Sequence, residues 1–172
     1  TEFYGAALWQ LNKAINSPYK SMLKLLLMEA YASEYPKTEL LCTHLKRAIY
    51  EGETNIDKLD SYVLMIGKLD DYLSTQESEE RIELARKCFY FKVHEWLTGN
   101  NTQEKSRSYE IMSELTVRWH WTHDQLLLLD SRETWKIDRV LEERSILVDE
   151  VTNSYRMLTD LVRQHTAETS IS

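Results

Sequence analysis

Residues 17–36 read SPYKSMLKLLLMEAYASEYP, and this stretch decides the fold class. Pro18 suits the first position of a helix because it has no N–H to leave unpaired, and Ser17 before it is a good N-cap. The apolar residues that follow occupy almost every side of a helix, which predicts a central, buried helix to about residue 34. Pro36 then keeps the residue before it out of the helical conformation.

The whole chain is poor in the residues that make turns. Its 172 residues include four glycines and two prolines, where average usage would supply roughly twenty of the two together. An all-β sandwich or barrel needs a turn signal about every 8–12 residues, so that class is excluded. The glycines are also too far apart for a glycine-rich loop that binds phosphate.

Apolar spacing predicts an all-α protein, an irregular bundle of about eight helices with a long C-terminal helix. We expect the third helix to be capped by Thr38, with Gly52 just past its end, and the fifth to end at Gly99. No composition shift marks a second domain, so residues 1–172 are expected to form a single helical domain. The helices are expected at about residues 2–15, 18–34, 38–50, 58–73, 79–98, 108–120, from 122 through 129, and 132–165.

The last predicted helix carries a seam of mostly apolar residues that alternate in steps of four and three, as in a coiled coil. The favoured interpretation is that this helix is simply the longest in the bundle and packs on its neighbours. The alternative is a seam for a homodimer or for contact with another domain. The seam consists of Ile137, Leu141, Arg144, Val148, Val151, Tyr155, Leu158 and Val162.

Composition indicates an ordinary globular chain. It is 42% hydrophobic and 28% charged, and no apolar run approaches the roughly 18 residues of a membrane span. The chain opens with Thr1 directly in an amphipathic pattern, without a signal peptide, so we expect a fragment of a longer protein. Cys42 and Cys88 both fall in helical patterns, which predicts reduced core thiols in a reducing, cytoplasmic compartment.

Charge is distributed unevenly along the chain. The net charge of −7 argues against nucleic acid as a partner. Residues 1–50 nevertheless contain six Lys and Arg against four Asp and Glu. If the chain binds an anion, its first fifty residues are therefore the better place to look.

The standard catalytic motifs are missing. The sequence contains no H-E-x-x-H, C-x-x-C, G-x-S-x-G or D-x-D, so we expect neither catalytic residues nor metal ligands here. His120 and His123 are separated by an expected helix boundary, which argues against a metal site. The run Phe89–Phe91 lies in a basic context that would suit base stacking, but its place on an apolar stripe favours core packing.

One basic segment lies around the first helix junction, and its members are Lys13, Ser17, Tyr19, Lys20 and Lys24. Lys20 and Lys24 are one turn apart on the same face of the second helix, and Lys20 is near the positive end of the helix dipole. Two ammonium groups and a hydroxyl would suit a polyphosphate. Spacing alone favours the simpler interpretation, a solvated basic edge.

Residues 2–13, EFYGAALWQLNK, resemble the E-Y-F-G-[SA]-[SA]-L-W-x-L-Y-K motif of class I adenylate cyclases, the large enzymes of gamma-proteobacteria. This chain has Phe-Tyr where the family has Tyr-Phe, and Asn12 where the family usually has Tyr. The likeness continues through SPYK at residues 17–20, RKCFYFK at 86–92 and WKID at 135–138. It spans nearly the whole chain.

The resemblance implies a parent enzyme that converts ATP to cyclic AMP and pyrophosphate with Mg²⁺. It also implies an upstream nucleotidyltransferase-like part, which carries G-S and D-x-D motifs and the metal ligands, and a downstream regulatory part. This chain resembles the later, helical part of the catalytic region, so the fragment alone is expected to hold no cofactor and to be inactive.

Helical modules of related nucleotidyltransferases often place lysines against the triphosphate. By that analogy of position, Ser17, Lys20 and Lys24 would contact ATP, and Trp9 or Tyr19 would line the base pocket. The alternative hypothesis is a non-catalytic interaction module that links the catalytic and regulatory halves or mediates dimerisation.

Overall fold

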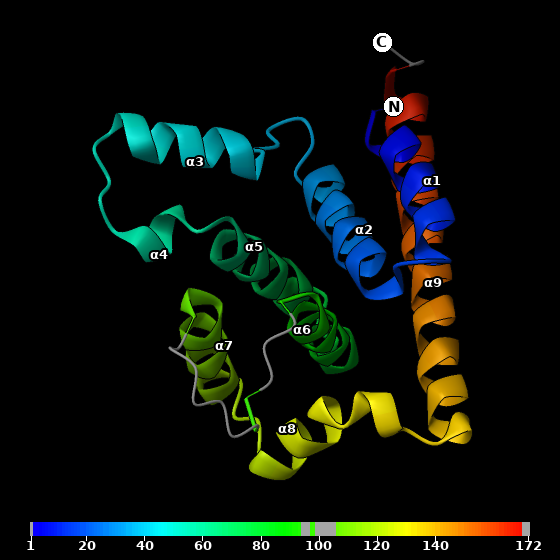
Figure 1. Ribbon diagram of the computed structural model, residues 1–172. Coiled ribbons are helices and arrows are strands. Elements are labelled where there is room, and N and C mark those ends of the chain that lie inside the picture. Colours follow the sequence, from blue (N-terminus) through cyan, green and yellow to red (C-terminus); the bar gives the residue numbers. More distant parts are fainter. Residues whose placement is uncertain (1, 94–96, 99–105, 170–172) are drawn as a thin grey trace. The chain divides into compact units, whose positions relative to one another are not determined.

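A computed structural model describes residues 2–93, 97–98 and 106–169, and within these ranges the chain is helical and contains no β-strand. The predicted all-α class is confirmed (Figure 1). The elements are α1 (Glu2–Ala14), α2 (Pro18–Ser33), α3 (Leu41–Tyr50), α4 (Ile56–Leu59), α5 (Ser61–Thr75), α6 (Glu79–Val93), α7 (Arg107–Arg118), α8 (His123–Asp130), the 3-10 helix η1 (Arg132–Thr134) and α9 (Ile137–Thr169).

The chain divides into two compact units. The first consists of residues 1–89 and 147–172, and the second of residues 90–146. The boundaries fall inside α6 and α9, and each unit is described by itself below. The expectation of a single helical domain stays a prediction.

Helix α2 is the centre of the first unit, as its sequence predicts. It packs against α1 and α5, and its buried apolar residues are Tyr19, Met22, Leu23, Leu25, Leu26, Ala30 and Tyr31. Pro18 occupies the first turn as expected, and the helix ends at Ser33, before Pro36. Ser17 precedes the helix, but its side chain makes no capping hydrogen bond.

Helix α3 begins three residues later than the sequence predicts. Thr38 does not cap it: its hydroxyl donates to the Tyr31 carbonyl oxygen at 2.9 Å. The Leu41 N–H donates to the Tyr31 hydroxyl at 3.0 Å, so the connection is tied to α2 rather than wound into α3. Gly52 follows α3 with φ of +83°, as its predicted place after the helix requires.

The predicted fourth helix is interrupted at Asp60. The Asp60 carboxylate accepts hydrogen bonds from the N–H groups of Tyr62 at 2.8 Å and Val63 at 3.1 Å. It therefore caps a new helix, α5, and the short α4 precedes it. A side chain that bonds the backbone two and three residues ahead competes with continued helix at its own position.

A buried ion network connects four helices of the first unit. Arg81 of α6 donates from Nη2 to both carboxylate oxygens of Glu29 on α2, at 3.0 and 2.8 Å, and from Nε to Glu150 on α9 at 2.5 Å. The Tyr72 hydroxyl of α5 donates to Glu29 at 3.0 Å. The side chain of Glu29 is fully buried, so Arg81 and Tyr72 replace the water that its carboxylate would otherwise bind.

The second unit is organised around Tyr90 and Asp130. The Tyr90 hydroxyl donates to one carboxylate oxygen of Asp130, and the other accepts from the Thr98 backbone N–H at 2.9 Å and the Thr98 hydroxyl at 2.5 Å. Burial and the Asp130 carboxylate both raise the pKa of Tyr90. Thr122 begins α8 with a reciprocal capping box to Gln125, so the predicted helix boundary there is confirmed.

The aromatic residues 89–91 and the two cysteines differ in how far they are buried. Phe89, Tyr90 and Phe91 are all buried, which confirms core packing over a stacking platform. Cys88 is buried as predicted, but the prediction for Cys42 is wrong because this thiol is exposed on α3. The predicted helix stop at Gly99 lies outside the described residues.

The predicted last helix is split. Residues 132–134 form η1, and α9 starts only at Ile137. Much of the predicted seam is exposed: Ile137 by 73%, Leu141 by 56% and Val148 by 55%. The residues that α9 buries are Glu143, Leu147, Glu150, Ser154 and Leu158, and of these five Leu158 alone belongs to the predicted seam. Leu158 is therefore the buried member of the seam.

No described helix is both long enough and apolar enough to cross a membrane.

Candidate functional site

The turn between α1 and α2 brings Lys13 close to Ser17. The backbone N–H groups of Asn16 and Ser17 both donate to the Lys13 carbonyl oxygen, at 3.2 and 3.0 Å. Lys13 lies in the last turn of α1 and Ser17 directly before α2. Both side chains are exposed, so an ammonium group and a hydroxyl are available at one end of the α1–α2 pair.

Lys20 and Lys24 extend this group along α2. Both are exposed, although their neighbours Ser21, Leu23 and Leu25 are buried. Ser17, Lys20 and Lys24 are spaced by three and four residues, which places them on one face of the helix. We call Lys13, Ser17, Lys20 and Lys24 the basic edge.

The lysines of the basic edge are not neutralised by nearby acids. Among the residues that the structure describes, no carboxylate forms an ion pair with Lys13, Lys20 or Lys24. Lys68 contrasts with them, because it pairs with Glu34 at 2.6 Å. The basic edge thus carries a local positive charge on a chain whose net charge is −7.

The two aromatic residues proposed for a base pocket lie in different surroundings. Trp9 on α1 is 60% exposed, and the Lys13 ammonium lies 5.0 Å from the centre of its ring. Tyr19 is buried in the core. Trp9 therefore offers ring surface next to the basic edge, whereas Tyr19 supports α2 from inside.

The potential metal-binding side chains of the described residues are dispersed. This part of the chain contains no group of three or more His, Cys, Asp or Glu side chains arranged to hold a metal ion. His120 and His123 lie on either side of the α8 cap. Glu29 and Glu150, two acidic groups of the first unit that share one guanidinium, are engaged by Arg81.

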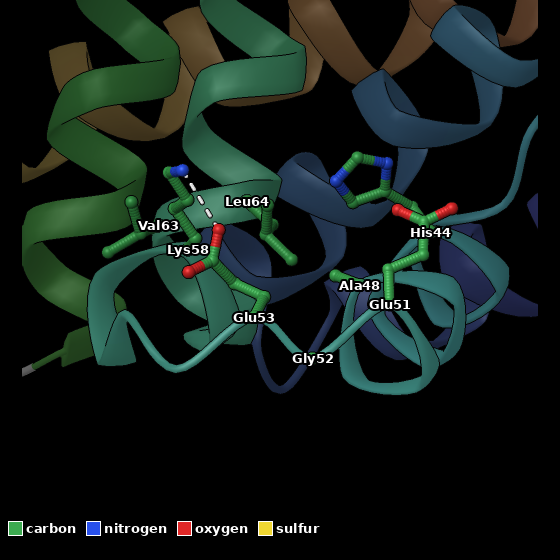
Figure 2. A pocket seen from close by; sticks show the side chains of 8 residues that line it. All are labelled: His44, Ala48, Glu51, Gly52, Glu53, Lys58, Val63 and Leu64. Atoms are coloured by element: carbon green, nitrogen blue, oxygen red, sulfur yellow. Dashed lines mark hydrogen bonds and ion pairs between the residues drawn. The ribbon is translucent and has the colours of Figure 1, made fainter.

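Sequence reasoning missed a pocket of about 690 Å³ in the first unit (Figure 2). It lies between α3, the loop that follows α3, α4 and α5, and it is lined by His44, Ala48, Glu51, Gly52, Glu53, Lys58, Val63 and Leu64. The amphipathic pattern of α3 was the available signal, since an apolar stripe on a short helix requires a partner surface. The pocket itself could not be predicted, because α3 and α5 are separate in sequence and their packing does not follow from either pattern alone.

The family described as "Adenylate cyclase, class-I, second domain" matches residues 1–172. The chain therefore belongs to the class I adenylate cyclase family. No solved structure matches it.

Curated relatives are longer proteins named adenylate cyclase. The chain is 37% identical over 173 residues to the one from Proteus mirabilis, 41% over 171 residues to that of Yersinia intermedia and 40% over 171 residues to that of Escherichia coli K12. Each alignment covers 99% of this chain but 20% of the relative. The chain thus spans about one fifth of their length.

Proposed function

We propose that this chain is the helical part of the catalytic region of a class I adenylate cyclase, which converts ATP to cyclic AMP and pyrophosphate. In this proposal the basic edge contacts the phosphates of ATP. The observation that carries the proposal is the pair Lys20 and Lys24, exposed on one face of the central helix and unpaired with any described carboxylate.

The chemistry of cyclisation explains why such a pair is useful. The leaving group is pyrophosphate, and negative charge builds up on its oxygens as the bond to the α-phosphate breaks. Ammonium groups held in place before the reaction stabilise that charge without having to reorganise. Lys20 and Lys24 are suited to this because α2 is anchored by its buried face and leaves only their side chains to adapt.

The other members of the basic edge have secondary parts in the proposal. The Ser17 hydroxyl, not used for capping, would donate to a phosphate oxygen, and Lys13 would add a third positive charge. Trp9 would stack on the base. Among the described residues, no three His, Cys, Asp or Glu side chains are grouped to hold Mg²⁺. In this proposal its ligands come from the upstream part of the parent chain.

The test uses the full-length parent enzyme. The double variant Lys20→Ala with Lys24→Ala should lower kcat/KM for ATP by at least about 100-fold, since each charge-assisted hydrogen bond contributes roughly 1.5 kcal/mol or more. Lys37→Ala removes an exposed lysine from the loop after α2 and serves as the matched control. Normal kcat/KM in a folded double variant would refute the role of the basic edge.

A second candidate function rests on the exposed seam of α9. Ile137, Leu141 and Val148 leave apolar surface on a long helix, which supports an interaction module that dimerises or contacts another domain. Leu141→Asp with Val148→Asp should abolish a concentration-dependent increase in sedimentation coefficient. Both positions are exposed, so the variant should fold, whereas Leu158→Asp would place a charge in the core. An unchanged sedimentation profile would rule out the seam as a dimer contact.

A further inference from the structure

Helix α3 has an apolar face that the described chain covers only in part. Leu41, Leu45, Ala48 and Ile49 recur at the spacing of one helix face, yet none of them is buried. Exposed apolar side chains continue around it, with Ile49 and Tyr50 at its end and Ile56 on α4. An amphipathic helix in a folded protein normally buries its stripe against a partner. The α3 face is therefore only partly covered by α5.

The uncovered space is the pocket of about 690 Å³ between α3 and α5. In Figure 2, Ala48 and Leu64 lie around its middle, with the Glu53–Lys58 ion pair and Val63 on one side and His44 with Glu51 on the other. Ala48 and Gly52 are small, which leaves the space open. The pocket thus combines an apolar part with four ionisable side chains, which suits an inserted side chain that has an apolar part and a neighbouring charged group.

We propose that a segment of the parent polypeptide outside residues 1–172 docks in this pocket. The segment inserts an apolar side chain over Ala48 and Leu64 and places a basic side chain against Glu51. The inference rests on the proposal that this chain is one part of a longer adenylate cyclase. It concerns a different surface from the basic edge and does not depend on ATP.

The length of the relatives argues for a covalently attached occupant. This chain covers only 20% of each, so a parent of that size has ample polypeptide to reach α3. A tethered segment binds at an effective concentration in the millimolar range, which makes even a small contact stable. Such a contact would complete the burial that α3 lacks.

Charge argues for a basic group on the occupant and against a second copy. Glu51 and Glu53 face the pocket with one cation, Lys58, which is already paired with Glu53 at 2.8 Å. Glu51 forms no ion pair with any described residue. In a two-fold contact between copies, the same acidic rim would meet itself, and like charges brought together oppose association.

Photo-crosslinking in the full-length polypeptide tests the proposal directly. Benzoylphenylalanine is incorporated in place of His44, which lines the pocket, and in a control in place of Thr43, the exposed neighbour that does not line it. We expect the His44 position to crosslink, in a product of monomer mass, to a peptide outside residues 1–172. The Thr43 position should not. A dimer band, or crosslinks confined to residues 1–172, would overturn the proposal.

A substitution provides a second readout that does not involve activity. Ala48→Arg fills the pocket floor, and Thr43→Arg adds the same charge on another side of α3. Ala48→Arg should speed amide hydrogen exchange at least about tenfold in the crosslinked segment, and Thr43→Arg should not. Equal effects of the two variants, or none, would contradict the proposal. Because no ATP is present, this outcome is independent of the Lys20 and Lys24 experiment.

Discussion

Arg81 is the residue on which the charge balance of the first core depends. Its guanidinium serves both Glu29 and Glu150, and Tyr72 completes the contacts of Glu29. Glu29 lies among buried apolar residues of α2, and its carboxylate is stable there because a cation reaches it. Which cation did so could not be read, because Arg81 lies 52 residues further along the chain.

Arg81→Met should lower the free energy of unfolding of the 172-residue chain by about 3–5 kcal/mol, because it leaves the Glu29 carboxylate buried without its cation. Arg163→Met is the matched control. It removes an exposed guanidinium that lies 3.6 Å from Asp160, and surface pairs of this kind contribute less than about 1 kcal/mol. Urea unfolding followed by circular dichroism measures both. If the two variants lose similar amounts of unfolding free energy, the buried network does not stabilise the chain more than a surface ion pair does.

The position at which a helix begins can depend on a single capping side chain. Asp60 and Ser17 both precede helices, but only Asp60 accepts hydrogen bonds from the first turn. The sequence predicted the Ser17 boundary correctly because Pro18 marks it. It missed the Asp60 break, since the apolar spacing continues across it and pattern alone does not report a cap.

Asp60→Ala should lower the free energy of unfolding by about 1 kcal/mol, the usual value of an N-cap. Ser17→Ala should change it by less than about 0.5 kcal/mol, because the Ser17 side chain makes no capping bond. Thermal unfolding of the two variants side by side provides the comparison. A larger loss for Ser17→Ala than for Asp60→Ala would contradict the assignment of the caps.

Two buried tyrosines connect the stability of the whole molecule to pH. Burial, reinforced by the carboxylates of Glu29 and Asp130, raises the pKa of Tyr72 and of Tyr90 above the ordinary value. A raised pKa means that the folded chain keeps protons which the unfolded chain releases above about pH 10. The stability from these groups is complete below that pH and is lost as the pH rises toward the folded-state pKa values.

The free energy of unfolding should therefore fall between pH 9 and pH 11, and the fall should be smaller in Tyr90→Phe, which has no proton to release there. Urea unfolding at the two pH values measures the difference. Tyr62→Phe provides a control, because the Tyr62 side chain is 42% exposed. An identical pH dependence in the Tyr90 and Tyr62 variants would contradict the role of the buried hydroxyl.

At the scale of the whole molecule, the sequence by itself determined the helical class, the central place of α2 and the basic edge. These follow from local physics: the scarcity of turn residues, the spacing of apolar side chains along one helix and the spacing of lysines on one face. The tertiary structure alone decided which residues meet across the chain. It joined Glu29 to Arg81, left much of the α9 seam exposed while burying Glu150 and Ser154, and formed a pocket beside α3, because burial depends on neighbours that are distant in sequence.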